Sequence, residues 1–241
     1  MPHLATAELI THTGVHVGGR WVPSASAERI DVLDPRTGAV LARVPAGSSA
    51  DVDRAVRAAR DAFPAWAASP VAERAGFLTA IAARLTERAD ELAAVVSREL
   101  GSPLSTSRRV HVDPAVGVFR SCADLAPRLD PWKPVGVVAA VAPSDHPLHH
   151  LARPLAAALA AGCTLVLAPS ARTPLSAYRL VELLDAVRLP PGVVNLVVGE
   201  AATVGGALAT HPGVDLVCTP GSGQPGVADL QEFLGTTAVQ R

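Results

Sequence analysis

The sequence predicts an α/β fold in which a doubly wound parallel sheet follows a small β entry and a helical segment. Apolar and polar residues alternate between residues 15 and 44, apolar residues recur at helical spacing between residues 48 and 125, and short runs of valine and leucine alternate with helices after residue 134. Hydrophobic residues make up 49% of the 241 residues, which is ample for a large buried core. We expect a single domain over residues 1–241, with the β entry and helices in 15–130 and the parallel core in 134–235.

The β entry is predicted from two stretches of alternating side chains. Residues 15–22 and 29–44 alternate apolar and polar residues, as strands with one buried face do. Asp34–Gly38 interrupts the second stretch with the composition of a tight turn. This pattern predicts a small antiparallel unit at the start of the fold.

Two amphipathic helices should follow the β entry. Ser48 and Asp51 have the spacing of a capping box. Ser69 followed by Pro70 resembles an N-cap residue with proline at the first helical position. The residues expected on the inward faces are Val52, Ala55, Val56, Ala59 and Phe63 in the first helix, and Phe77, Ile81 and Leu85 in the second.

Two further helices precede the core. One is expected from about Glu87 to Leu100 and should end at Gly101, a residue type that favours helix C-termini. Another should cover Ser105 to about Leu125. This second helix carries Arg108, Arg109 and His111, which we interpret as a solvated helix face.

The period changes after Val135, where apolar runs alternate with helices. Such runs of valine and leucine are typical of parallel strands buried on both faces, so this half should form a doubly wound, Rossmann-like domain. Ligands of such sheets bind outside the carboxyl ends of the strands. Those ends are expected at Pro143–His146, Ala168–Ala171, Gly199–Ala202 and Thr219–Ser222.

Composition limits the classes of partner and the compartment. The formal net charge is -1 without a basic stripe, so we expect a small-molecule substrate and neither a nucleic-acid nor a membrane partner. The start of the chain does not resemble a signal peptide, and no apolar run approaches the roughly 20 residues of a membrane span, which predicts a cytoplasmic protein. The cysteines have no metal-site or disulfide spacing and are expected to pack as reduced, apolar residues: Cys122, Cys163 and Cys218.

Several motifs along the chain resemble those of one known family. As a set and in this order they are similar to the coenzyme-binding domain of the aldehyde dehydrogenase superfamily, over roughly residues 15–235. The motifs are Gly18–Trp21, Asp34–Gly38, Ala62–Trp66, Pro134–Val138, Ala160–Pro169, Leu189–Asn195 and His211–Asp215.

The sequence departs from the family pattern at positions that carry the family's catalytic groups. The resemblance places the family's nucleophilic cysteine and its Glu-Leu-Gly-Gly segment beyond Arg241, so we expect no thiol-based aldehyde oxidation. The family has a Trp-Asn-Phe segment whose asparagine donates a hydrogen bond to the oxyanion, and the matching positions are Ser144, Asp145 and His146. An ionised Asp145 can only accept hydrogen bonds, which inverts that role.

The resemblance also bears on cofactor binding and assembly. The lysine and glutamate that hold the adenosine ribose in the family are replaced by Ala168 and Ala171, so we expect no NAD(P) cofactor. Gly221 and Ser222 keep the phosphate-side turn in vestigial form. The segment between residues 124 and 134 is shorter than the family's intersubunit hairpin, so an oligomer, if formed, is not expected to be of the family type.

The polar residues after the Val135–Val141 run are the candidate site: Ser144, Asp145, His146, His149 and His150. In one interpretation Asp145 caps the helix that opens at Pro147, and the histidines are surface or packing residues. In another, the helix dipole keeps His149 or His150 neutral, and Asp145 and these histidines perform acid/base chemistry. A third interpretation is a metal site made of Asp145, His146 and His150.

Three functional hypotheses follow from these features. The first is a repurposed enzyme that performs cofactor-independent acid/base chemistry, of lyase, isomerase or cyclase type, on a small molecule in the former dinucleotide cleft. The second is a non-catalytic scaffold that pairs with another chain. The third is an NAD(P)-dependent oxidoreductase half that is completed in trans.

Overall fold

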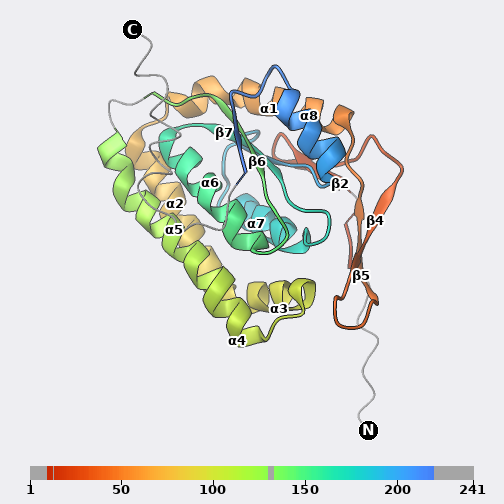
Figure 1. The fold of residues 1–241 in the computed structure, drawn as a ribbon. Helices are drawn as coiled ribbons and strands as arrows, with labels where there is room; N and C mark the ends of the chain where they lie inside the picture. Colours follow the sequence, from red (N-terminus) through yellow and green to blue (C-terminus); the bar gives the residue numbers. More distant parts are fainter. Residues whose placement is uncertain (1–9, 13, 130–132, 220–241) are drawn as a thin grey trace.

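The main sheet runs through the centre of the domain (Figure 1). The computed structural model describes residues 10–12, 14–129 and 133–219. Within that part of the chain the six-stranded sheet has the order β3-β2-β8-β7-β6-β9, in which β8, β7, β6 and β9 are parallel and the β2–β3 hairpin joins β8 antiparallel. The strands are β2 (Gly14–Val17), β3 (Arg20–Pro23), β6 (Val137–Val141), β7 (Thr164–Ala168), β8 (Val194–Leu196) and β9 (Leu216–Cys218). The predicted α/β class with a parallel sheet is confirmed.

A second, three-stranded sheet lies at the side of the domain, where β4 and β5 form a long ribbon (Figure 1). Its strands are β1 (Ile10–Thr11), β4 (Arg29–Leu33) and β5 (Val40–Pro45), with β4 and β5 antiparallel. The expected β entry is therefore divided between two sheets. The physical reason is a non-local pairing, because His16 of β2 pairs with Leu196 of β8 and draws the hairpin into the main sheet.

Helices cover both faces of the main sheet. Alternate residues of β6 point to opposite faces: Val137 and Ala139 pack in the cluster that contains α1 and α8, whereas Val138 and Ala140 pack in the larger cluster that contains α2, α5, α6 and α7. The helices are α1 (Ser49–Ala67), α2 (Val71–Glu87), α3 (Ala89–Leu100), α4 (Leu104–Ser107), η1 (Arg108–Val112), α5 (Asp113–Leu125), η2 (Ala126–Leu129), α6 (Pro147–Ala161), α7 (Leu175–Ala186), η3 (Ala201–Gly205) and α8 (Gly206–Thr210).

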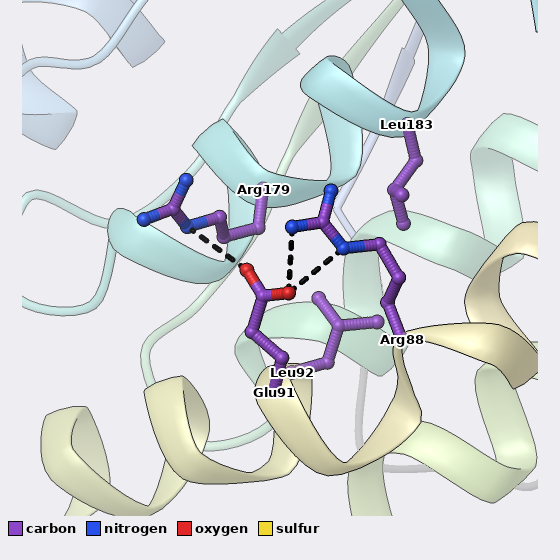
Figure 2. Close-up of a pocket in the computed structure, with 5 residues that line it drawn as sticks. All are labelled: Arg88, Glu91, Leu92, Arg179 and Leu183. Carbon is purple, nitrogen blue, oxygen red and sulfur yellow. Dashed lines mark hydrogen bonds and ion pairs between the residues drawn. The ribbon is translucent and has the colours of Figure 1, made fainter. Parts of the chain in front are cut away.

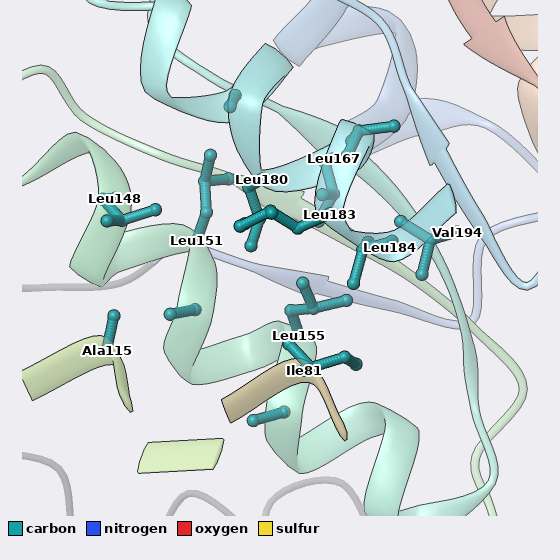
Figure 3. Packing of buried hydrophobic residues seen from close by; sticks show 14 of the residues in the cluster. Ile81, Ala115, Leu148, Leu151, Leu155, Leu167, Leu180, Leu183, Leu184 and Val194 are labelled. Carbon is teal, nitrogen blue, oxygen red and sulfur yellow. The ribbon is translucent and has the colours of Figure 1, made fainter. Parts of the chain in front are cut away.

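The centre of the larger cluster is α6, which is buried along nearly its whole length. Its leucines pack against leucines of α7 and of the sheet (Figure 3). Leu148, Leu151 and Leu155 follow the spacing of one helical face. The helix begins at Pro147 and ends before Gly162, whose φ of 89° is left-handed. This packing fixes the start of α6 directly after the loop that carries the candidate site.

Two local predictions for the helices are wrong. Ser69 does not cap α2, whose N-cap residue is Pro70, because the Ser69 hydroxyl instead donates to the Trp66 carbonyl at 2.6 Å and closes the end of α1. His111 does not lie on a solvated face, since only 4% of its surface is exposed. The capping box of Ser48 and Asp51 is confirmed at the start of α1.

The described residues include no helix that is both long and apolar enough to cross a membrane. Cys122 and Cys163 are buried, as expected of cysteines that pack as small apolar side chains.

Candidate functional site

The parallel sheet reverses its direction of growth at β6. The chain passes from β6 to β7 and β8 on one side and then returns to form β9 on the other side of β6. A crevice outside the carboxyl ends of strands at such a switch point is where doubly wound folds bind ligands. The loop after β6, residues 142–146, lies at this point.

Hydrogen bonds tie the loops at this edge to one another. Thr173 Oγ1 donates to the Ser144 carbonyl at 3.3 Å, and Thr173 N donates to the Ser170 carbonyl at 3.1 Å. Ser170 also forms an isolated parallel bridge to Gly199 after β8. A Cβ on Gly199 would come within 2.3 Å of Val204 Cγ2, so glycine allows η3 to pack directly against the strand end. These contacts hold the loops after β6, β7 and β8 in one frame.

A buried carboxyl group holds the helix that follows the second of these loops. Glu99, at the end of α3, accepts hydrogen bonds from the backbone N–H groups of Leu175 and Ser176 in the first turn of α7. Burial raises the pKa of Glu99 to about 8, against the opposite effect of those N–H groups. The Ser176 hydroxyl, which is also buried, favours the charged form of Glu99 and so acts in the same direction as the N–H groups. Glu99 could not be identified as a buried group from the sequence, because a glutamate near a helix end is usually solvated.

Four histidine rings gather beside the loop after β6. The ring centroids are 4.9 Å apart for His111 and His146, 5.2 Å for His146 and His150, and 6.3 Å for His149 and His150. His111 comes from η1, and the other three come from the start of α6. Asp145 Oδ1 lies 3.4 Å from His150 Nδ1. We call His111, His146, His149, His150 and Asp145 the histidine cluster.

Burial favours the uncharged form of three rings of the histidine cluster, those of His111, His149 and His150. The pKa values of His111 and His149 are lowered to about 4, mainly by burial and to a lesser extent by neighbouring positive charge. Burial also lowers the pKa of His150, although Asp145 opposes this effect. At neutral pH each of these rings therefore carries one N–H donor and one bare nitrogen acceptor.

The buried faces of these rings have unused hydrogen-bonding capacity. The Nδ1 atoms of His111, His149 and His150 are buried without a hydrogen-bond partner. The separation of Asp145 and His150 is within ion-pair range but does not make a hydrogen bond. Unpartnered polar atoms in a protein interior are uncommon and call for an explanation.

The structure brings together most of the predicted site residues. Asp145, His146 and His150 lie close to one another, and Ser144 is linked to the next loop. Asp145 is not the helix cap, because the N-cap residue is His146 and it makes no side-chain capping bond. Within the described ranges, no group of three histidine, cysteine or acidic residues is arranged to hold a metal ion. His111 was missed because its place beside α6 depends on helix packing.

The edge of the sheet at the carboxyl ends of its parallel strands, here called the carboxyl edge, has the topology of a dinucleotide site. Its side chains offer few groups that could bind the dinucleotide. Ala168 and Ala171 are buried at the loop after β7 and offer no polar side chain. The side-chain hydroxyls that follow these strands in the described part of the chain are those of Ser144, Ser170, Thr173, Thr203 and Thr219. Gly221 and Ser222, the predicted phosphate-side residues, lie outside the described residues and stay a prediction.

A small surface pocket between α3 and α7 is a different kind of feature (Figure 2). Glu91 accepts from Arg88 Nε at 2.8 Å and lies 3.7 Å from Arg179 Nε. Arg179 Nη1 also lies 2.7 Å from Glu182 Oε2, outside the pocket, so the two guanidinium groups have two carboxylate partners. The remaining lining residues are Leu92 and Leu183. The pocket offers no uncompensated charge to a ligand.

Comparison with known proteins decides the family. The model of the aldehyde dehydrogenase family matches residues 21–228. The chain belongs to the aldehyde dehydrogenase family. A Staphylococcus aureus protein assigned to the aldehyde dehydrogenases is 37% identical over 228 residues, which cover 89% of this chain and 47% of the relative. The chain spans about half the length of the curated relatives it matches.

Solved structures of aldehyde dehydrogenases share the fold. Aldehyde dehydrogenase C of Pseudomonas syringae, in complex with NAD+ and octanal, is 38% identical with a TM-score of 0.83, over 86% of this chain and 45% of that chain. PnpE from Pseudomonas, in complex with nicotinamide adenine dinucleotide, is also 38% identical with a TM-score of 0.83, over 86% and 46%. Lactaldehyde dehydrogenase of Escherichia coli is 33% identical with a TM-score of 0.84, over 88% and 47%.

These relatives correct two expectations. The hypothesis of cofactor-independent lyase, isomerase or cyclase chemistry is wrong, because the relatives are aldehyde dehydrogenases. The expectation of no NAD(P) cofactor is also wrong, because structures this similar are NAD complexes. It gave too much weight to Ala168 and Ala171, since two side chains are a small part of the surface that a dinucleotide contacts in a fold of this kind.

Proposed function

We propose that this chain forms the dinucleotide-binding part of an NAD(P)-dependent aldehyde dehydrogenase. The observation that carries the proposal is the parallel sheet with its switch point at β6, in a fold shared with NAD-bound relatives at a TM-score of 0.83. When bound, the dinucleotide supplies the hydride acceptor for oxidation of an aldehyde. The complete reaction is part of the proposal, because the chain spans about half the length of these relatives.

The loops after β6, β7 and β8 would surround the dinucleotide. The hydroxyl groups of Ser144 and Ser170 can donate to ribose or phosphate oxygens. The hydrogen bond that Thr173 donates to the Ser144 carbonyl supports the proposal. It holds the loops after β6 and β7 in fixed relative positions before the ligand binds. Preorganisation of this kind reduces the entropy lost on binding.

Ala168 and Ala171 change how the ribose would be held. The family's lysine and glutamate make charge-assisted hydrogen bonds at these positions, as the motif resemblance implies, whereas the alanines leave that recognition to backbone groups and hydroxyls. Restoring the charged side chains should therefore add contacts to a cleft that already binds. A gain in affinity would indicate that the dinucleotide site is present and only its ribose contacts have changed. No gain would indicate that the site itself has been lost.

Calorimetric titration of NAD and NADP into the 241-residue chain tests the proposal. We expect saturable binding of at least one dinucleotide with a Kd below about 1 mM. The double variant Ala168→Lys/Ala171→Glu should bind NAD at least about 10-fold more tightly, because each charge-assisted bond contributes about 1.5–3 kcal/mol. Ala65→Lys, an exposed position on α1, is the matched control and should leave the Kd unchanged. Absence of binding in both the wild type and the double variant would overturn the proposal.

A further inference from the structure

We propose that Glu99 is a positioning residue for the dinucleotide, because it holds the loop after β7, residues 169–174, in the conformation that binds. This inference rests on the proposed function, which places the dinucleotide at the carboxyl edge, and it adds a residue that comes from a helix outside that edge. Glu99 lies at the end of α3 and is only 3% exposed. Because it is buried, it acts through the backbone of the loop.

The helix that follows this loop begins without a side-chain cap of its own. The N-cap residue of α7 is Pro174, whose side chain has no group that could accept a hydrogen bond. The N–H groups in the first turn of a helix have no partner within the helix and need one from elsewhere. Glu99 provides it, because its two carboxyl oxygens accept from Leu175 N and, at 3.2 Å, from Ser176 N. A carboxyl group of α3 therefore replaces the missing local cap.

The residue that Glu99 fixes at the start of α7 is close in the chain to the residue that joins the loops. Thr173, two positions before Leu175, donates from Oγ1 to the Ser144 carbonyl at 3.3 Å and from N to the Ser170 carbonyl at 3.1 Å. Ser170 in turn pairs with Gly199 after β8. The position of the first turn of α7 therefore determines how the loops after β6, β7 and β8 are held together.

The helix that carries Glu99 is itself held against α7. Glu91, about two turns before Glu99 on α3, lies 3.7 Å from Arg179 Nε on α7 (Figure 2). Leu92 of α3 and Leu183 of α7 belong to the same buried cluster. These contacts fix α3 relative to α7, so the Glu99 carboxyl group is an acceptor at a fixed position.

Loss of the carboxyl group should weaken dinucleotide binding without removing any group that touches the ligand. Two buried N–H groups would lack an acceptor, and a buried donor without a partner costs free energy. The first turn of α7 would then shift toward water and draw Thr173 away from the Ser144 carbonyl. The apparent Kd rises as the fraction of molecules in the binding conformation falls.

Calorimetric titration of NAD into variants of the 241-residue chain tests the inference. Glu99→Met keeps the length of the side chain but removes the oxygen acceptors, and should raise the Kd about 10-fold. Glu99→Gln keeps one acceptor oxygen and should stay within about 3-fold of the wild type. Glu91→Met, the same substitution at an exposed carboxylate of α3, should leave the Kd unchanged. Val32→Ala in β4, outside the main sheet, lowers stability through a cavity and should also leave the Kd unchanged.

Two further measurements make the result decisive. Hydrogen–deuterium exchange without ligand should be faster in residues 169–177 of Glu99→Met than of the wild type, and unchanged there in Glu91→Met. Thr173→Val removes the hydroxyl that joins the loops and should also raise the Kd, which tests the inference if Glu99→Met does not fold.

The outcomes separate this inference from the proposed function. An unchanged Kd in folded Glu99→Met, an equal rise in Val32→Ala, or an unchanged Kd in Thr173→Val overturns the role of Glu99 alone, provided that the wild type binds NAD. Absence of NAD binding by the wild type overturns the proposed function and, with it, this inference.

Discussion

The buried carboxyl group of Glu99 should make the stability of this domain depend on pH. Burial raises its pKa from 4.5 to about 8 in the folded state, whereas in the unfolded chain the group is solvated and titrates near its ordinary value. Between these two values the folded state holds a proton that the unfolded state has lost. The free energy of unfolding therefore contains a favourable contribution that is fully present below about pH 4.5 and is lost as the pH rises through about 8.

The size of the effect follows from the linkage relation. Each pH unit in this interval changes the free energy of unfolding by about 1.4 kcal/mol, so roughly 3 kcal/mol should be lost between pH 5 and pH 8. Glu99→Gln removes the titrating group and keeps one acceptor oxygen for the Leu175 N–H, but its amide NH2 group cannot accept from the Ser176 N–H. The variant should therefore lack this pH dependence, and its stability relative to that of the wild type should rise by roughly 3 kcal/mol between pH 5 and pH 8.

Denaturant unfolding followed by circular dichroism at several pH values measures this difference. Glu91→Gln is the matched control, because that carboxylate is exposed and paired with Arg88, and its pH profile should run parallel to that of the wild type. A wild type and a Glu99→Gln variant with parallel pH profiles would refute the reasoning. Such a result would mean that the N–H groups of α7 hold Glu99 in its ionised form.

Two further predictions concern the core and the residue before β6. Leu155→Ala should lower the free energy of unfolding by about 2–5 kcal/mol, because it leaves a cavity between α6 and α7. Leu104→Ala, at an exposed position on α4, should change the free energy of unfolding by less than about 1 kcal/mol. Thermal denaturation of both variants checks this prediction, and equal effects would contradict the described core. Gly136→Ala should destabilise the chain, because φ is 128° and the added Cβ would lie 1.9 Å from Asp215 Oδ2, which accepts from Val137 N at 2.7 Å. Gly76→Ala, inside α2 with open space around it, should instead stabilise by up to about 1 kcal/mol, and a similar loss in both glycine variants would contradict the special role of Gly136.

Much of the core could be predicted from the sequence because its signals are local. The strands β6 and β7 are short apolar runs, and α6 has a proline at its start and a glycine after its end, so each element is specified by its own residues. The pairing of β2 with β8 could not be predicted in the same way. It depends on a contact between His16 and Leu196, which are far apart in the chain.

The residues of the candidate site also differ in whether local sequence or long-range packing determines their position. Asp145, His146 and His150 follow one strand, so their proximity could be inferred from a single strand-to-helix turn. His111 joins them only because the helical segment around η1 packs beside α6, and local periodicity suggested a solvated residue. Glu99 was missed for the same reason, since its partners Leu175 and Ser176 belong to a distant helix.

The central claim is that the carboxyl edge of the parallel sheet binds a nicotinamide dinucleotide. Hydrogen–deuterium exchange measured by mass spectrometry, with and without NAD, tests it most directly because it reports where the ligand binds. We predict that NAD slows exchange in residues 142–146, 168–173 and 199–203 and leaves the β4–β5 ribbon unchanged. Unchanged exchange in all three loops, or protection confined to another part of the chain, would contradict the claim.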